Sequence, residues 1–171
     1  MRIAREFRNP YCLRALYFSL VRSVLESCVI VWSPYAELWI RNIESVQSRF
    51  IRFALRFLPW CNRMELPPYK KRCCLLGMDT LAKRRKIFGV VMVGKLLTGL
   101  IDAPCILSQI NINAPARNFR SADILRLDFQ HTVYGQNEPI MAICSSFNSL
   151  YVHSDFCCSS DSFKNRLRQA L

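Results

Sequence analysis

The first hundred residues place apolar side chains at the spacing of α-helices. Between Tyr11 and Trp32 an apolar residue recurs every three or four positions, which is typical of one buried helix face. These residues are Leu13, Leu16, Tyr17, Leu20, Val24, Cys28 and Val31. We expect a single helix here that ends at Ser33-Pro34, because a residue that precedes proline avoids the helical conformation.

A second helix is predicted from Glu37 to Leu58, with Pro59 as its end. At about 100° per residue, one face is apolar, formed by Ile40, Ile43, Val46, Phe50, Phe53, Ala54 and Phe57. Four arginines fall within about 80° of one another on the opposite face. We call them the arginine ridge: Arg41, Arg49, Arg52 and Arg56.

A short helix over Tyr69–Leu76 is predicted next, with Gly77 after it. Asp79 or Thr80 can then cap a longer helix that reaches Thr98 and stops at Gly99.

This longer helix begins with four consecutive cations, Lys83, Arg84, Arg85 and Lys86, which point around its axis. From Ile87 onward it is apolar on nearly every side. We therefore expect the first turns to project into water or toward a ligand, and the remainder to be enclosed by neighbouring helices.

Beyond Pro104 the periodicity weakens. The segment from Ile112 to His131 is predicted to be irregular with a few short strands, followed by helices over Pro139–Val152 and Ser160–Ala170. No internal repeat is present. The predicted fold class is mainly α: a helical bundle over residues 1–101, and an irregular, partly extended C-terminal extension with terminal helices over residues 102–171.

The composition agrees with a folded chain. Hydrophobic residues make up 51% of the 171 positions, with only 5 Gly and 8 Pro, which excludes collagen-like and disordered classes. The mean hydropathy of +0.10 is high for a small domain and points to a membrane or to apolar surface meant for a partner. The longest apolar stretch, Ile87–Ile101, is too short for a membrane span and contains Lys95. Arg14, Arg22 and Glu26 interrupt any signal peptide.

Positive charge is concentrated in the first half of the chain. The net charge is +12; residues 1–86 contain 17 basic and 6 acidic side chains (+11), and residues 87–171 contain 7 and 6 (+1). A polyanion would therefore meet the first half. The arginine ridge could neutralise phosphates, and the four cations open a helix whose free amides and dipole also favour anions. The alternative is that these are solvated faces and that Lys83 to Lys86 is a weak nuclear-import pattern.

The sequence encodes no recognisable catalytic or metal motif. Nine cysteines occur without a C-x-x-C pattern, and the two histidines, His131 and His153, lack the spacing of a zinc site. We expect reduced, mostly buried thiols inside a cell. A cysteine–histidine nucleophile pair needs only to meet in space, yet no local signature supports one. Two-metal chemistry needs paired carboxylates, but the aspartates are scattered singly: Asp79, Asp102, Asp123, Asp128, Asp155 and Asp161. Phosphate-binding glycine loops are absent, and we expect no cofactor.

Five segments stand together in order: REFRNPYCLRALYFSLVRSVLESCVIVWSPY from Arg5, RNIESVQSRFIRFALRFLPW from Arg41, LPPYKKRCCLLGMDTLAKRRK from Leu66, YGQNEPI from Tyr134 and SFKNRL from Ser162. Over nearly the whole chain they resemble the C-terminal portion of the reverse transcriptases of jockey-type, LINE-like non-LTR retrotransposons. The resemblance implies a polymerase thumb over residues 1–101 and a post-thumb extension over 102–171. Ser27 stands where an aromatic residue is common in that family, and Lys70-Lys71 where acidic residues are usual.

In that family the fingers and the catalytic palm, with its Asp-Asp pair, precede this region. The resemblance therefore implies a fragment that does not polymerise and at most binds the RNA or DNA backbone non-specifically, in the nucleus or the cytoplasm. The candidate binding residues are Arg41, Arg49, Arg52, Arg56, Lys83, Arg84, Arg85 and Lys86. The alternatives are a fragment that docks an uncovered apolar face on the missing fingers–palm region or a related full-length polymerase, a peripheral membrane protein, and a remnant without function.

Overall fold

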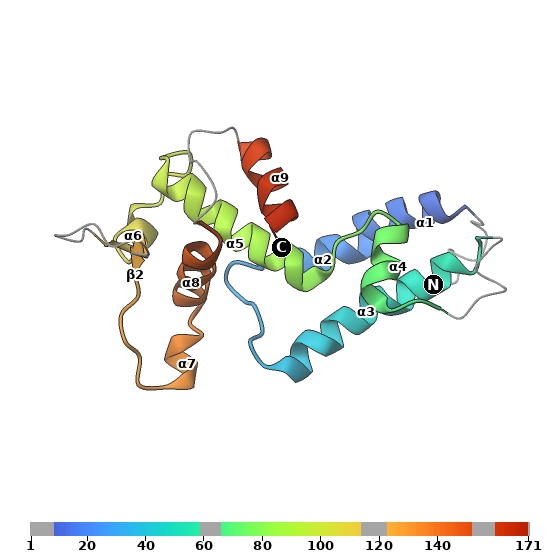
Figure 1. Ribbon diagram of the computed structural model, residues 1–171, viewed down its shortest axis with the longest axis horizontal. Helices are drawn as coiled ribbons and strands as arrows, with labels where there is room; N and C mark the ends of the chain where they lie inside the picture. The colour runs from blue at the N-terminus through green and yellow to red at the C-terminus, as the bar shows by residue number, and fades with distance from the viewer. Residues whose placement is uncertain (1–8, 59–65, 114–122, 152–159, 171) are drawn as a thin grey trace. The chain divides into compact units, whose positions relative to one another are not determined.

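The computed structural model describes residues 9–58, 66–113, 123–151 and 160–170, and over these it is mainly helical, as the sequence predicts (Figure 1). The chain forms two compact units. The N-terminal unit comprises Met1–Val29 and Pro34–Arg84, and the C-terminal unit comprises Ile30–Ser33 and Arg85–Leu171. The division lies inside a helix, because the apolar part of that helix from Ile87 onward belongs to the core of the C-terminal unit.

The N-terminal unit begins with a continuous helical segment made of α1 (Pro10–Tyr17), a π-helical stretch (Phe18–Arg22) and α2 (Ser23–Glu26). The Asn9 side chain caps it, accepting a hydrogen bond of 2.9 Å from the Tyr11 amide. The predicted end at Ser33 is wrong. The helix stops at Glu26 because Ser27 is already extended, with φ of −62° and ψ of 136°, and Cys28 after it is left-handed with φ of 53°, although apolar residues continue at helical spacing.

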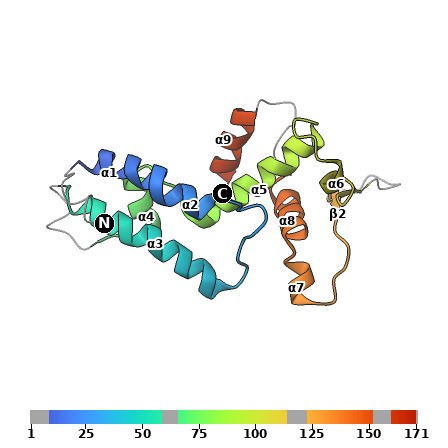
Figure 2. The same ribbon diagram turned by 180° about the vertical axis from the view of Figure 1, so that it is seen from behind.

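Helix α3 (Glu37–Leu55) and helix α4 (Tyr69–Leu75) complete the packing of this unit, and α1 and α4 both lie against α3 (Figures 1 and 2). The Tyr17 ring stacks on Phe50 with centroids 4.2 Å apart. The predicted apolar face of α3 is only partly right: Phe50 and Ala54 are buried, but Val46 is exposed. The side chains of α3 that the structure buries are Gln47, Phe50, Ile51, Ala54 and Leu55.

The turns around the next helix follow the sequence prediction closely. Gly77 ends α4 with a φ of 61°, and Gly99 follows α5 (Leu81–Leu97) with a φ of 71°, both in the left-handed region that glycine tolerates. Thr80 caps α5, because its hydroxyl oxygen accepts a 3.3 Å hydrogen bond from the Lys83 amide. These helix boundaries are confirmed to within a residue or two.

The C-terminal unit packs α8 (Pro139–Tyr151) and α9 (Ser160–Ala170) against the apolar part of α5. The approach of α5 to α8 is close: a methyl group added at Gly89 would lie 3.1 Å from an Ile143 side-chain carbon. Two short helices flank the region predicted to be irregular, Ile112–His131: α6 (Pro104–Leu107) and α7 (Val133–Gln136). Within its described part, the short strand β2 (Leu125–Arg126) pairs antiparallel with β1 (Asn111–Ile112).

Candidate nucleic-acid interface

The arginine ridge is exposed along α3. All four side chains point away from the buried face of the helix, as the helical wheel predicts. Arg41 is engaged with Glu37 one turn earlier, at 2.9 Å between Nε and Oε1, in a fully solvated pair. Arg49, Arg52 and Arg56 have no ion-pair partner anywhere in the described ranges. These three cations span about 10 Å along the axis.

A buried polar network fixes the orientation of α3 from its other side. Gln47 is fully buried; its amide nitrogen donates to the Tyr69 hydroxyl and to the Asp79 carbonyl, both at 3.0 Å, and its amide oxygen accepts from the Tyr17 hydroxyl at 3.2 Å. Neighbouring Glu44 accepts a hydrogen bond from the Tyr69 hydroxyl. Because these bonds join α3 to three other segments, the rotation of α3, and with it the direction of the arginine ridge, is set by the interior.

The start of α5, where the sequence favours an external anion, already has an internal one. The Glu44 carboxylate accepts a 2.7 Å hydrogen bond from the Ala82 amide, and Thr80 satisfies the Lys83 amide. A carboxylate at a helix N-terminus interacts favourably with the helix dipole in the same way as a phosphate. The expected phosphate position at this helix start is therefore occupied by the protein itself.

Arg84 also has a counterion within the protein. Its guanidinium forms a two-pronged ion pair with Glu26, with 2.8 Å between Nη2 and Oε2, and both side chains are mostly buried. This hydrogen-bonded pair raises the pKa of Arg84. Arg22 approaches the same carboxylate at 3.8 Å and stacks over the Phe18 ring, and burial followed by repulsion from Arg84 lowers the pKa of Arg22.

The other three cations at the start of α5 lie in different environments. Arg85 is buried, with its guanidinium carbon 5.5 Å from the centre of the Trp32 ring, whereas Lys86 is exposed and Lys83 is half-buried. The expectation that the first turns of α5 project into water or toward a ligand is therefore wrong for Arg84 and Arg85. Consecutive residues point around a helix, so two of the four side chains turn toward the protein.

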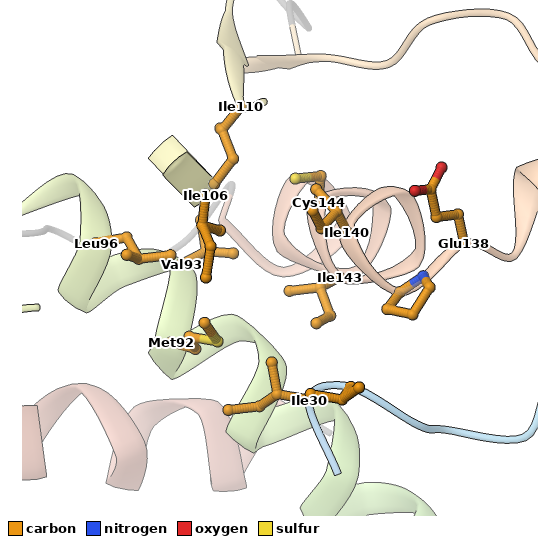
Figure 3. Close-up of a pocket in the computed structure, with 12 residues that line it drawn as sticks. Ile30, Met92, Val93, Leu96, Ile106, Ile110, Glu138, Ile140, Ile143 and Cys144 are labelled. Carbon is orange, nitrogen blue, oxygen red and sulfur yellow. The ribbon is translucent and has the colours of Figure 1, made fainter. Parts of the chain in front are cut away.

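The C-terminal unit contains a pocket of about 250 Å³, and it is almost wholly apolar (Figure 3). Met92, Val93 and Leu96 of α5 face Ile140 and Ile143 of α8 across it. Glu138 and Cys144 are the carboxyl and thiol groups among its lining residues, and burial raises the pKa of the Cys144 thiol. A raised thiol pKa lowers the reactivity of a cysteine as a nucleophile.

No cluster of three metal-ligating side chains is found among the described residues. His131 is exposed, and its ring meets Phe129 edge-on with 5.1 Å between centroids; His153 lies outside the described residues. No helix in the ranges that the structure covers is both long and apolar enough to cross a membrane.

Sequence reasoning missed two groups of residues. The first is the set of internal anions and amides, Glu26, Glu44 and Gln47, whose partners are distant in sequence. The second is the exposed aromatic pair Tyr35 and Trp39 at the start of α3. On the helical wheel Trp39 falls within the apolar face, so only the absence of a covering element in the structure distinguishes it from a core residue.

No known protein family, curated protein sequence or solved structure matches this chain.

Proposed function

We propose that this chain is the thumb and post-thumb region of a non-LTR retrotransposon reverse transcriptase, and that it binds the phosphate backbone of nucleic acid through Arg49, Arg52 and Arg56 without reading bases. The observation that carries the proposal is that these three arginines are exposed on one helix face with no internal counterion in the described ranges. The resemblance of the sequence to the thumb region supplies the polymerase origin. Arg41 contributes at the edge of the ridge, where Glu37 competes for it.

Helix geometry supports external anions at the ridge better than at the start of α5. Solvated guanidiniums attract phosphates and release their counterions, which gives backbone affinity without sequence preference. Arg52 lies in the last turn of α3 and Arg56 at its C-cap, where the helix dipole also stabilises cations. At an exposed site the dipole alone stabilises a cation by about a few tenths of a kcal/mol. It does not explain the position of Arg49, which lies nearly two turns before the helix end.

The test is the salt dependence of binding to a DNA duplex by the full chain. Replacing Arg49, Arg52 and Arg56 with Gln removes three phosphate contacts, so the slope of log affinity against log salt should flatten by about 2.7, at about 0.9 for each contact. The matched control is Lys70→Gln, Lys71→Gln and Arg166→Gln, which removes the same charge from exposed positions that lie outside α3 and outside the candidate binding residues. If both triple variants lose the same slope, general charge rather than the ridge explains the binding.

A second candidate function, protein binding, is favoured by a separate surface. Between β2 and α8, four large apolar side chains are exposed: Leu127, Phe129, Val133 and Tyr134. Exposed apolar side chains concentrated in one segment are typical of interaction sites, and the resemblance makes a fingers–palm region or a related polymerase the expected partner. Binding to such a partner that persists at high salt, and that Phe129→Ala and Tyr134→Ala together abolish, would support this function, because apolar burial is not screened.

A further inference from the structure

Two aromatic side chains at the beginning of α3 are exposed. Trp39 is 60% exposed and Tyr35, just before the helix, is 53% exposed. Both figures show the N-terminal half of α3 extending away from α4, which packs near the other end of the helix (Figures 1 and 2). The fully buried side chains of α3 begin at Gln47. In the first turn of α3, by contrast, Glu37, Leu38 and Trp39 are all exposed.

Neither ring is engaged within the described part of the chain. The ring pairs of this unit involve Tyr17, Phe18, Phe50, Phe53 and Phe57, and the guanidiniums that approach rings lie over Tyr11, Phe18 and Tyr69. Trp39 and Tyr35 thus keep both a flat apolar face and a polar edge available.

The same helix determines which partner fits these rings. Arg49 lies about 15 Å further along the axis from Trp39 and about 80° around it, so one elongated ligand can touch both. The exposed acidic side chain of this stretch, Glu37, is already paired with Arg41. A ligand that lies along α3 therefore needs flat apolar groups at one end and negative charge at the other. Single-stranded nucleic acid has both, since unpaired bases offer their faces to aromatic side chains and the backbone supplies phosphates.

We propose that Trp39, assisted by Tyr35, stacks on unpaired bases of a single strand whose backbone runs onto Arg49, Arg52 and Arg56. This inference rests on the proposed function, because the arginines supply the charge that selects a nucleic acid. It goes further in assigning the ligand class: a single strand, or the unpaired end of a duplex, is preferred to a closed duplex. In a closed duplex each base face is covered by its neighbours, and the rings gain nothing.

The test compares Trp39→Ala with the unaltered full chain on a thymidine oligonucleotide of about 20 nucleotides and on a closed hairpin duplex of equal charge. Stacking on one base contributes enough that its loss should weaken single-strand binding about ten-fold. Hairpin affinity should change less than about two-fold, and the salt slope on either ligand should stay the same, because no phosphate contact is removed. Trp39→Phe retains a ring and should keep most of the affinity.

Leu38→Ala is the matched control, since Leu38 is equally exposed and adjacent but has no flat ring. A direct readout comes from fluorescence: with Trp32 and Trp60 replaced by Phe, the one remaining tryptophan, Trp39, should be quenched by the oligonucleotide and not by the hairpin. Since Trp39 and Leu38 are exposed, their variants should keep the helical circular dichroism of the parent chain.

The outcomes separate the two proposals. Suppose that the ridge variant flattens the salt slope but Trp39→Ala leaves single-strand affinity unchanged. This result overturns the stacking inference and leaves backbone binding in place. The inference also fails if Leu38→Ala weakens binding as much as Trp39→Ala, because the patch would then act as a general apolar surface for a protein partner. No binding to either oligonucleotide, or a salt slope that the ridge variant leaves unchanged, overturns the proposed function and the inference with it.

Discussion

Both units of this chain have an apolar core, but the N-terminal unit adds a buried polar network to its core. In the N-terminal unit, the Gln47 and Glu44 side chains hydrogen-bond Tyr17, Tyr69 and the backbone at the start of α5. In the C-terminal unit, by contrast, the core between α5, α8 and α9 is apolar, with Phe147 fully buried at its centre. Hydrogen bonds are directional and apolar contacts are not. The hydrogen bonds of the N-terminal unit therefore set how its helices are rotated about their axes. The apolar contacts of the C-terminal unit mainly hold its helices together.

One buried amide in each unit makes this difference concrete. Asn148 of α8 serves a single residue: it accepts from the Leu125 amide at 3.1 Å and donates to the Leu125 carbonyl at 2.8 Å, which holds the short strand β2 in place. Gln47 connects three separate segments instead. Since the arginine ridge shares α3 with Gln47, the exposed surface that we propose to be functional belongs to the unit with the more exactly specified interior.

The largest expected effect is on the apolar unit. Phe147→Ala should lower the free energy of unfolding of the C-terminal unit by about 3–5 kcal/mol, because it removes a fully buried aromatic ring and leaves a cavity. Amide hydrogen exchange measured peptide by peptide should show lost protection in α8 and α9, with α3 unchanged. Phe129→Ala, at a position 80% exposed, should change stability by less than about 0.5 kcal/mol. Equal loss of protection in α3 would show that the two interiors unfold as one.

Gln47→Leu tests the polar interior with a side chain of similar size. The Tyr17 hydroxyl and the Asp79 carbonyl would lose their Gln47 partner in a buried site, which should cost about 2–3 kcal/mol. Hydrogen exchange should increase in α1, α4 and the first turn of α5 together. Asn148→Leu should have a similar cost, but its effect on exchange should be confined to β2 and its neighbours. If Gln47→Leu also acts on one segment alone, the contrast between the two amides does not hold.

Alkaline pH should weaken the N-terminal unit before the C-terminal unit. Burial raises the pKa of both Tyr17 and Tyr69, and the hydrogen bond to Glu44 raises that of Tyr69 further. The raised pKa values of these two tyrosines contribute in full to the free energy of unfolding below the ordinary tyrosine pKa of about 10. Above it the unfolded chain loses these protons and the folded chain keeps them, so stability falls by about 1.4 kcal/mol per pH unit for each tyrosine.

Urea unfolding between about pH 9 and about pH 11, followed by Trp39 fluorescence in a chain with Trp32 and Trp60 replaced by Phe, should show this loss. Burial also raises the pKa of Cys73 in one unit and Cys144 in the other, so thiol titration weakens both units and does not favour either. Tyr69→Phe should remove part of the pH dependence. A pH dependence that is unchanged in this variant would mean that Tyr69 does not cause it.

Much of the fold could be predicted because local signals decide it. Helical spacing located α3 and α8, the Thr80 cap located the start of α5, and Gly77 and Gly99 marked helix ends through conformations that other residues avoid. The exposure of the arginine ridge follows from the same periodicity. These features depend on neighbours within one or two turns, and such neighbours can be read directly from the sequence.

The rest of the site depends on partners that are far apart in sequence. Arg84 and Glu26 are 58 residues apart, and Glu44 caps a helix that begins 37 residues later. A hydropathy pattern places Gln47 among polar surface residues, although it is fully buried. Its burial is stable only because distant partners hydrogen-bond its amide group. The left-handed turn at Cys28 likewise has no local signal, since the apolar spacing runs through it unchanged.

The smallest expected effect concerns a place in the described part of the N-terminal unit where the polar interior is incomplete. Arg72 of α4 is only 6% exposed, and its Nε and Nη1 atoms are buried with no hydrogen-bond partner in the described ranges. The Tyr69 ring, 5.9 Å from the guanidinium carbon, gives a weak cation–π contact. A buried charge without a counterion costs more than such a contact returns, so Arg72→Met should raise the free energy of unfolding of this unit by about 1 kcal/mol.

Arg14→Met is the matched control: Arg14 donates a 2.7 Å hydrogen bond to the Leu76 carbonyl, so its loss should destabilise the same unit. Urea unfolding of both variants measures the difference in sign. If Arg72→Met is destabilising as well, the polar interior of the N-terminal unit extends to Arg72, and the contrast with the apolar unit is larger than its hydrogen bonds indicate.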